Sequence, residues 1–305
     1  MTEVPRIELC AGIHSDEREH WLAERRKTIG ASEVPTVLGL NPWETPLQLA
    51  LRKQGRMPEK DETEAMNLGS RLEPVIVQLW EEETGRQTLD LGPFTIQRND
   101  SYPFLGATLD REALPCDDHP MPGVLECKAP GAHMLDQWDG GVPLYVQAQC
   151  QAQMAVTGMD WASVAALIGG QRFLWADLVV NNDFIAFMVS KVEQFWAIVQ
   201  RGDLPEPTAD DVKAIKYLYP DHVPEKVVEL PVEAIALVDA LEENAIRLKS
   251  INTVVTEGEN RLKMLIGDAE IGILPNGVRY SYKTSQRKGY TVEPTKVRTL
   301  RRLKK

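Results

Sequence analysis

The chain has 305 residues, of which 43% are hydrophobic and 26% charged, and its mean hydropathy of -0.28 is that of an ordinary globular protein. No apolar run approaches the ~20 residues of a membrane span and the N-terminus lacks a signal pattern, so we expect a cytoplasmic protein without a membrane partner. The four cysteines show no C-x-x-C spacing, which favours reduced thiols over a zinc site or a disulfide framework.

The net charge of -11 hides an asymmetry between the two ends of the chain. Residues 279–305 contain ten basic residues and a single acidic residue, Glu293, so this segment carries +9 and residues 1–278 carry -20. A basic segment on an acidic body is common in proteins that contact a polyanion locally. A solubilising C-terminus is the alternative interpretation.

The first part of the chain is predicted to be helical. Residues 14–55 indicate three short helices, with Ser32 as the N-cap of the second and Thr45 as the N-cap of the third. Residues 61–84 carry apolar side chains at helical spacing and are followed by Gly85, which predicts a long helix that stops there.

From residue 86 the pattern alternates between strands and helices. Short strands are predicted at 87–97, 104–112, 123–129, 161–170 and 172–180, and helices at 142–158 and 182–200. This order predicts an α/β fold with a central mixed sheet flanked by helices.

Three regions are predicted along the chain. Residues 1–205 form the α/β domain, residues 206–230 are a Pro-rich linker, and residues 231–305 form a C-terminal unit that contacts DNA or a partner. We expect this unit to contain a long helix, or a helical hairpin broken near Glu257 and Gly258, followed by a small β-element at 277–292.

Two predicted strands carry polar residues at alternate positions. "GATLDR" places Thr108 and Asp110 on one face, and "GVLECKAPG" places Glu126 and Lys128 on one face. Neighbouring strands lie about 4.8 Å apart, so the charged groups converge if these strands pair. Two carboxylates and the backbone carbonyl of Cys127 are suitable Mg²⁺ ligands, and the lysine is placed to orient or deprotonate a water molecule. The alternative is an edge strand that shows its polar face to water.

The flanking motifs resemble the YqaJ-type viral recombinase family, relatives of the phage lambda exonuclease in the PD-(D/E)XK nuclease superfamily. The resemblance covers roughly residues 15–200 and rests on five motifs in order: "WLAERRKTIGASEVPTVLGLNPWETPLQL", "NLGSRLEPVIVQLWEEETG", "FLGATLDRE", "LECKAPG" and "YVQAQCQAQMAVTG". It implies a restriction-endonuclease-like core and a 5'→3' exonuclease that acts on linear duplex DNA and generates 3' single-stranded tails for recombination by annealing.

The resemblance further implies a homo-oligomer, a ring-shaped trimer, and a single-strand annealing protein as partner. The cofactor it implies is Mg²⁺, as two ions, with Mn²⁺ able to substitute. By the same resemblance, Asp110 and Glu126 match metal ligands, Glu73 on the long helix helps to hold the second metal, and Lys128 acts on the attacking water.

The helix at 142–158 carries four glutamines on two faces. At 100° per residue, Gln147 and Gln151 share one face, whereas Gln149 and Gln153 share another. The resemblance places Gln149 in the site, where it orients water or Lys128; an exposed polar face is the alternative.

The resemblance also implies a pocket for a 5'-phosphate. Arg25 and Ser32 match the pair that grips the phosphate, Thr108 matches a hydroxyl beside it, and His133 is expected to replace an arginine of the family. The alternative is that Ser32 only caps a helix and Arg25 is a surface charge. Trp43 is either a wedge that stacks on an end base or a loop aromatic that covers the core.

Two other functions remain open from the sequence. An endonuclease or repair nuclease on the same core would cut closed circular DNA. A catalytically silent DNA-binding or accessory protein would have no need to keep all of Asp110, Glu126, Lys128 and Glu73.

Overall fold

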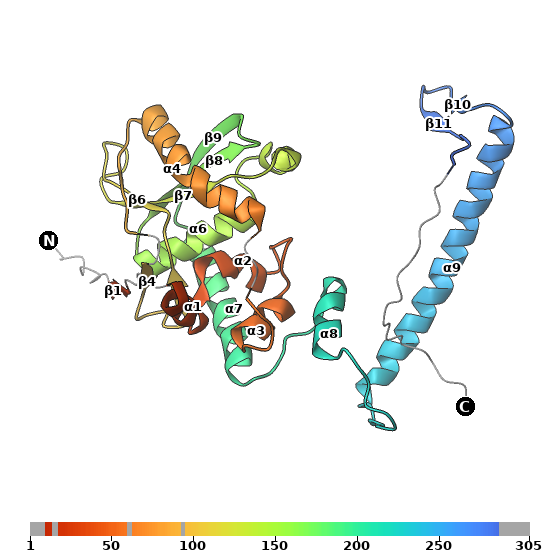
Figure 1. The fold of residues 1–305 in the computed structure, drawn as a ribbon, viewed down its shortest axis with the longest axis horizontal. Coiled ribbons are helices and arrows are strands. Elements are labelled where there is room, and N and C mark those ends of the chain that lie inside the picture. Colours follow the sequence, from red (N-terminus) through yellow and green to blue (C-terminus); the bar gives the residue numbers. More distant parts are fainter. Residues whose placement is uncertain (1–9, 14–17, 60–62, 93–94, 287–305) are drawn as a thin grey trace. The chain divides into compact units, whose positions relative to one another are not determined.

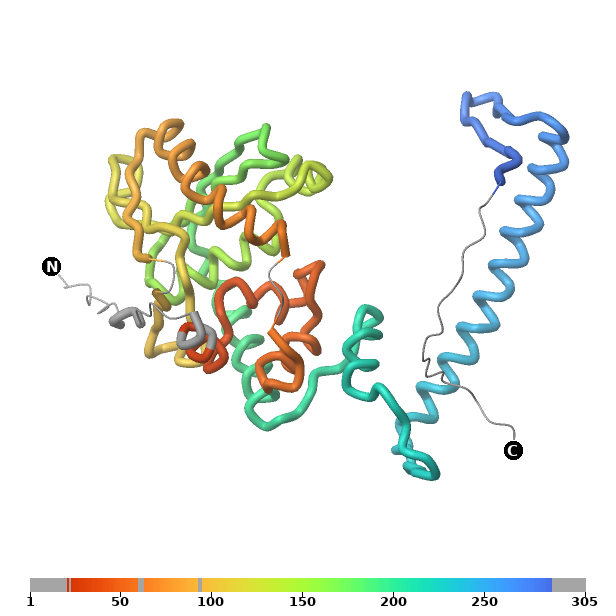
Figure 2. The backbone as a smooth tube through the Cα atoms, viewed as in Figure 1, coloured from red at the N-terminus to blue at the C-terminus, as the bar shows by residue number. Residues whose placement is uncertain are grey.

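A computed structural model describes residues 10–13, 18–59, 63–92 and 95–286, and the chain divides into two compact units, 1–219 and 220–305 (Figures 1 and 2). Within these ranges, no helix combines the length and apolar character needed to cross a bilayer. The described cysteines Cys116, Cys127 and Cys150 are free thiols.

The first unit contains two sheets. A four-stranded sheet has the order β1 (Cys10–Ile13), β4 (Ile96–Arg98), β5 (Leu105–Ala107) and β2 (Ile29–Gly30), in which β2 and β5 are parallel and the other pairs antiparallel. A five-stranded sheet has the order β3 (Thr88–Leu89), β6 (Arg111–Ala113), β7 (Gly123–Lys128), β8 (Trp161–Ile168) and β9 (Arg172–Val179). In the second sheet β7 and β8 are parallel and all other pairs are antiparallel, which confirms the mixed sheet.

The helices of this unit are α1 (Arg18–Arg26), α2 (Val34–Val37), α3 (Pro46–Lys53), α4 (Glu64–Thr84), α5 (Leu135–Trp138), α6 (Leu144–Thr157), α7 (Asn182–Gln200) and α8 (Val212–Leu218), with short 3-10 turns η1 (Ala31–Glu33), η2 (Ala132–Met134) and η3 (Ala209–Asp211). Helix α4 covers one face of the five-stranded sheet and α6 covers the other, with α7 packed on α6 (Figure 1). Because side chains alternate along a strand, β7 contributes Val124 to the core that contains α6 and α7, and Leu125 to the core under α4. The fold is therefore a helix–sheet–helix sandwich.

The side of the sheet under α4 is held by two buried tryptophans. Trp80 of α4 is fully buried and donates from Nε1 to Ser163 Oγ of β8 at 2.8 Å. Trp161 lies against the first residue of β7, where a Cβ on Gly123 would come within 2.2 Å of the indole. Only glycine leaves room for this packing.

The helix ends agree with the sequence in two cases and differ in one. Thr45 caps α3 by accepting from Gln48 N, and Gly85 ends α4 with a φ of 68°, as predicted. The prediction that Ser32 is an N-cap is wrong, since Ser32 lies inside η1 and the cap position is Gly30. The N–H of Gly30 donates instead to the Glu33 carboxylate at 2.8 Å.

The predicted strand at 104–112 is also wrong as a single strand. It is divided into β5 and β6, which belong to different sheets, and Thr108 and Asp110 lie in the three-residue connection between them. The expected pairing of this region with the following strand is nevertheless present, because β6 is antiparallel to β7 with Arg111 opposite Leu125. Asp110 therefore lies next to the backbone of β7, directly beyond the paired residues of β6 and β7.

The first part of the predicted 206–230 linker is folded. Residues 209–218 form η3 and α8, and Ala214 packs with Leu47 and Leu51 of α3. Asp211 is fully buried, where it accepts from the Thr45 hydroxyl and from the Thr208 N–H at 2.7 Å. These contacts attach the segment to α3, so a plain linker does not begin at residue 206.

The second unit contains one long helix and a small hairpin of strands. Helix α9 (Glu233–Ile266) runs without interruption through Gly258, so the expected long helix is present and the helical hairpin is wrong. A single glycine costs about 1 kcal/mol in a helix, which does not break one of this length. Strands β10 (Ile271–Ile273) and β11 (Arg279–Ser281) pair antiparallel, whereas residues 287–292 of the predicted β-element lie outside the described residues.

Candidate active site

The centre of the candidate site is a buried carboxylate at the end of β7. Glu126 is 3% exposed and lies on the same face of the strand as Lys128, as the alternation predicts. Its Oε1 accepts from Lys128 Nζ at 2.6 Å and from Gln149 Nε2 at 2.7 Å, and Lys128 also donates to Gln149 Oε1 at 3.0 Å. Three polar groups thus form a closed ring, which excludes the alternative of an edge strand that shows its polar face to water.

Helix α6 presents the predicted glutamine face to this ring. Gln153, one turn after Gln149, donates to Glu126 Oε2 at 2.6 Å and to the carbonyl of Thr108 at 3.4 Å. On another face, Gln147 and Gln151 contact backbone groups of Val142, Val179 and Asn181. From the sequence, Gln153 was grouped with Gln149 on one helical face, but no role was predicted for Gln153. The four-residue spacing from Gln149 was the only feature of the sequence that pointed to Gln153.

Asp110 lies where the chain crosses from one sheet to the other. Its Oδ2 accepts the Cys127 N–H at 2.7 Å, which fixes the carboxylate against β7. Since the N–H and C=O of a strand residue point to the same edge, the Cys127 carbonyl faces the same side as Asp110. Burial raises the pKa of Asp110 well above its usual value, and the Glu126 carboxylate raises it further, while Lys128 opposes the rise.

Glu73 approaches this group from α4, on the other side of the sheet. Its Oε1 accepts from Arg111 Nη1 at 2.7 Å, and Arg111 also lies 3.2 Å from Asp90. Burial raises the pKa of Glu73, Arg111 lowers it, and the Glu126 carboxylate raises it again. The sequence did not predict a role for Arg111, because only the β6–β7 register brings it to the helix.

A cavity of about 170 Å³ connects Asp110 to the predicted phosphate residues. Arg25, Ser32, Thr108, Asp110 and Gln149 are among the residues that line it. Arg25 Nη2 lies 3.5 Å from Ser32 Oγ, and its guanidinium lies 4.7 Å from the centre of the Trp21 ring. Residues from α1, η1, the β5–β6 connection and α6 therefore share one concave surface.

Two predicted residues lie elsewhere. His133 is an exposed residue of η2 and is not among the residues that line this cavity. Trp43 is 59% exposed and contacts Tyr145 of α6, a residue packed against the core, edge-on at a centroid distance of 5.3 Å. The wedge interpretation of Trp43 stays a prediction.

The acidic group has the donor chemistry of a divalent-cation site. In the part of the chain that the structure describes, no group of three His, Cys, Asp or Glu side chains is arranged so that it could hold a metal ion by itself. Mg²⁺ does not require one, because it keeps several waters and uses one or two carboxylates. Among the described residues, Asp110 Oδ1 and Glu73 Oε2 accept no hydrogen bond, and Gln153 Oε1 is buried without a partner. Hard oxygen donors and raised carboxyl pKa values together fit a cation such as Mg²⁺.

Lys128 differs from a surface lysine in its surroundings. Burial lowers the pKa of Lys128, but the carboxylates of Glu126 and Asp110 raise it more, so the net direction is upward. The side chain is consequently held as an ammonium group that donates to Glu126 and Gln149. In this arrangement it can orient a neighbouring water or stabilise a developing negative charge.

Known proteins match this chain over most of its length. The sequence model of the YqaJ-like viral recombinase domain matches residues 20–160. The uncharacterized protein YqaJ of Bacillus subtilis (strain 168) is 30% identical over 281 residues, which cover 89% of this chain and 85% of that protein. The uncharacterized protein R354 of Acanthamoeba polyphaga mimivirus is 23% identical over 232 residues, 70% of this chain and 42% of that protein.

A solved structure supports the fold. The alkaline exonuclease LHK-Exo of Laribacter hongkongensis superposes with a TM-score of 0.50 and 21% identity, over 60% of this chain and 93% of that chain. The fold of this chain is thus the PD-(D/E)XK fold of the alkaline exonucleases. With the extended match to YqaJ, the chain belongs to the YqaJ-like viral recombinase family.

Proposed function

We propose that the protein is a metal-dependent exonuclease that degrades one strand of linear duplex DNA from its 5' end and leaves 3' single-stranded tails. The observation that carries this proposal is the single cavity that joins Arg25, Ser32 and Thr108 to Asp110 and Gln149. A guanidinium with hydroxyl groups is suited to bind a terminal phosphate. The carboxylates beside it are suited to hold the cation that hydrolysis requires.

In this proposal each residue has a defined task. Asp110, Glu126 and Glu73, with the Cys127 carbonyl, hold Mg²⁺, as two ions, or Mn²⁺ in its place. A bound divalent ion polarises the scissile phosphate and lowers the pKa of a bound water. Because its ammonium form is stabilised, Lys128 acts by orienting that water and by stabilising negative charge, and Gln149 keeps Lys128 in place.

The proposed assembly and partners rest on family resemblance alone. They comprise duplex DNA ends as substrate, a homo-oligomer such as a trimeric ring, and a single-strand annealing protein that covers the 3' tails in the cytoplasm.

The basic segment 279–305 is proposed to contact the DNA backbone, since it supplies a positive charge that the acidic remainder of the chain lacks.

The test uses a linear duplex with a 5'-phosphate at one end and a 5'-hydroxyl at the other, with Mg²⁺ or with EDTA. We expect the wild type to release mononucleotides from the phosphorylated end, and Lys128→Ala and EDTA to abolish the release. Lys213→Ala, which removes an exposed lysine of α8, is the matched control and should retain activity.

Other outcomes would contradict the proposal. Nicking of closed circular DNA would identify an endonuclease, because this DNA has no free end from which an exonuclease could start. Absence of any cleavage, with DNA still bound, would identify a binding protein that has kept the nuclease fold.

A further inference from the structure

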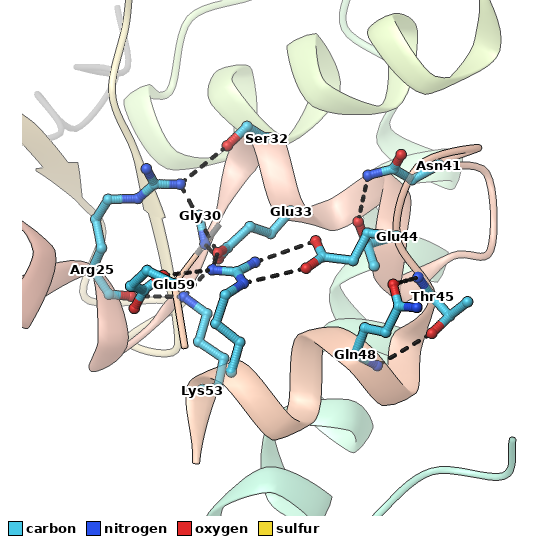
Figure 3. Close-up of polar contacts among 12 residues, drawn as sticks. Arg25, Gly30, Ser32, Glu33, Asn41, Glu44, Thr45, Gln48, Lys53 and Glu59 are labelled. Atoms are coloured by element: carbon cyan, nitrogen blue, oxygen red, sulfur yellow. Dashed lines mark hydrogen bonds and ion pairs between the residues drawn. The ribbon is translucent and has the colours of Figure 1, made fainter. Parts of the chain in front are cut away.

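A buried ion network contacts Arg25 and Gly30, which line the cavity together with Ser32 (Figure 3). Its central group is Glu33, which is 4% exposed. One carboxylate oxygen accepts from the Gly30 N–H at 2.8 Å and from Lys53 Nζ at 2.6 Å. The other accepts from Arg52 Nη1 at 3.0 Å and lies 3.9 Å from Arg25 Nη2.

Lys53 extends this network into the backbone. Its buried ammonium group donates to the carbonyls of Arg25 and Thr28, both at 2.7 Å, in addition to Glu33. An ammonium group has three donors, so all of them are used. Lys53 thereby ties the end of α1 and the start of β2 to α3, and these two segments carry part of the cavity wall.

The other cation of this network, Arg52, is held mainly by different carboxylates. It makes two contacts of 3.2 Å with Glu44 and one of 3.4 Å with Glu59, besides the contact with Glu33. Arg25 is therefore the cation farthest from Glu33. Its guanidinium is directed by Glu33 and Ser32 without being closely neutralised, which leaves donors for an anion in the cavity.

Glu33 stays ionised despite its burial. Burial by itself raises the pKa of Glu33. The charges of Lys53, Arg25 and Arg52 lower the pKa by more, so the net value is about 2. Removal of this charge would leave Lys53 and Arg52 buried without their shared carboxylate, which is costly in a protein interior. Removal of the charge would also weaken or abolish the hydrogen bond that the Gly30 N–H donates to Glu33.

We propose that Glu33 is a positioning residue for terminal-phosphate recognition. It holds the Gly30–Ser32 turn by its hydrogen bond to Gly30 and directs the Arg25 guanidinium into the cavity. The preference for a 5'-phosphate over a 5'-hydroxyl end therefore depends on a residue that does not itself face the DNA. The inference rests on the proposed function and deepens it.

The test compares Glu33→Gln with Glu44→Gln. Both substitutions remove a buried carboxylate that binds Arg52, but only Glu33 contacts Gly30 and Arg25. Binding of duplexes with 5'-phosphate or 5'-hydroxyl ends is measured by fluorescence anisotropy in EDTA, so that no cleavage occurs. We expect Glu33→Gln to reduce the preference of the wild type for phosphorylated ends about tenfold, and Glu44→Gln to leave it unchanged.

Kinetics in Mg²⁺ give a second measurement. For phosphorylated ends, Glu33→Gln should raise KM about tenfold with kcat little changed, because the lost contact affects binding rather than chemistry. Activity on hydroxyl ends should not change. If Glu33→Gln does not fold, Glu33→Asp keeps the charge but withdraws the carboxylate, and it should reduce the preference where Glu44→Asp does not.

Three results would overturn the inference. They are an unchanged preference in the Glu33 variants, an equal loss in the Glu44 variants, or a wild type that does not distinguish the two ends. A wild type that prefers phosphorylated ends in EDTA, a preference that Glu33→Gln abolishes, supports the inference even if no cleavage occurs in Mg²⁺. That last outcome would refute only the proposed nuclease activity.

Discussion

The substitution Gln153→Met separates the contribution of Gln153 to stability from its contribution to the site. Gln153 is fully buried, and its Nε2 donates to Glu126 Oε2 at 2.6 Å, whereas its Oε1 is buried without a partner among the described residues. Loss of a hydrogen bond to a charged group costs about 1.5–3 kcal/mol, and removal of a buried unsatisfied oxygen returns about 1–3 kcal/mol. Methionine has a similar volume, so we expect the free energy of unfolding to change by no more than about 2 kcal/mol.

The same substitution should reduce activity strongly. Glu126 would keep its contacts from Lys128 and Gln149 on Oε1 but lose the only side-chain donor to Oε2 among the described residues. Loss of a group that orients a metal ligand typically lowers activity or metal affinity about 10–100-fold. Urea unfolding and mononucleotide release from the phosphorylated duplex measure the two effects on the same preparation.

Gln151→Met is the matched control on the same helix. It removes the hydrogen bond that Gln151 donates to the Val179 carbonyl at 2.8 Å and the one that it accepts from the Asn181 N–H at 2.9 Å. Neither of these hydrogen bonds involves Glu126. We expect it to lower stability by about 1–2 kcal/mol and to leave kcat unchanged. The reasoning is refuted if Gln153→Met retains full activity, or if it loses more than about 3 kcal/mol of stability.

Three further predictions concern packing, ionisation and charge. Gly123→Ala should lower the free energy of unfolding in urea by about 3 kcal/mol or more, because its Cβ would lie 2.2 Å from Trp161; full stability would show that the indole can move. Since the pKa of Asp110 is raised, Mn²⁺ affinity measured by calorimetry should fall as the pH is lowered through that pKa, with proton release on binding. Without metal the stability contributed by protonated Asp110 is present at low pH and is lost as the pH rises through the raised pKa; a flat profile, or one unchanged in Asp110→Asn, would contradict this. Deletion of residues 279–305 should weaken duplex binding and flatten its dependence on salt, and unchanged binding would exclude a DNA contact by this segment.

The site was predictable from the sequence where local geometry decides the positions. The alternation of a strand places Glu126 and Lys128 on one face, and the spacing of a helix places Gln149 and Gln153 on one face. Both groupings occur in the structure. Neither grouping required knowledge of what lies opposite, because two residues apart in a strand or four apart in a helix are neighbours in any fold.

Contacts between distant segments were not predictable in the same way. Ser32 has the side chain of an N-cap, yet the Gly30 N–H is satisfied by Glu33, and that carboxylate is held in place by Lys53 of another helix. Local preference for a cap is worth only about 1 kcal/mol, so contacts with a distant helix can decide where the turn begins. Arg111 likewise reaches Glu73 only through the pairing of β6 with β7.

The sequence by itself determined the α/β class and the polar faces of β7 and α6, because these follow from the periodicity of single segments. Tertiary structure alone decided that Asp110 lies between two sheets and that Arg25 opens onto the same cavity as Asp110. The physical reason is that burial, pKa and charge pairing depend on which distant segments meet. Those contacts are set by sheet register and core packing, which no single segment encodes.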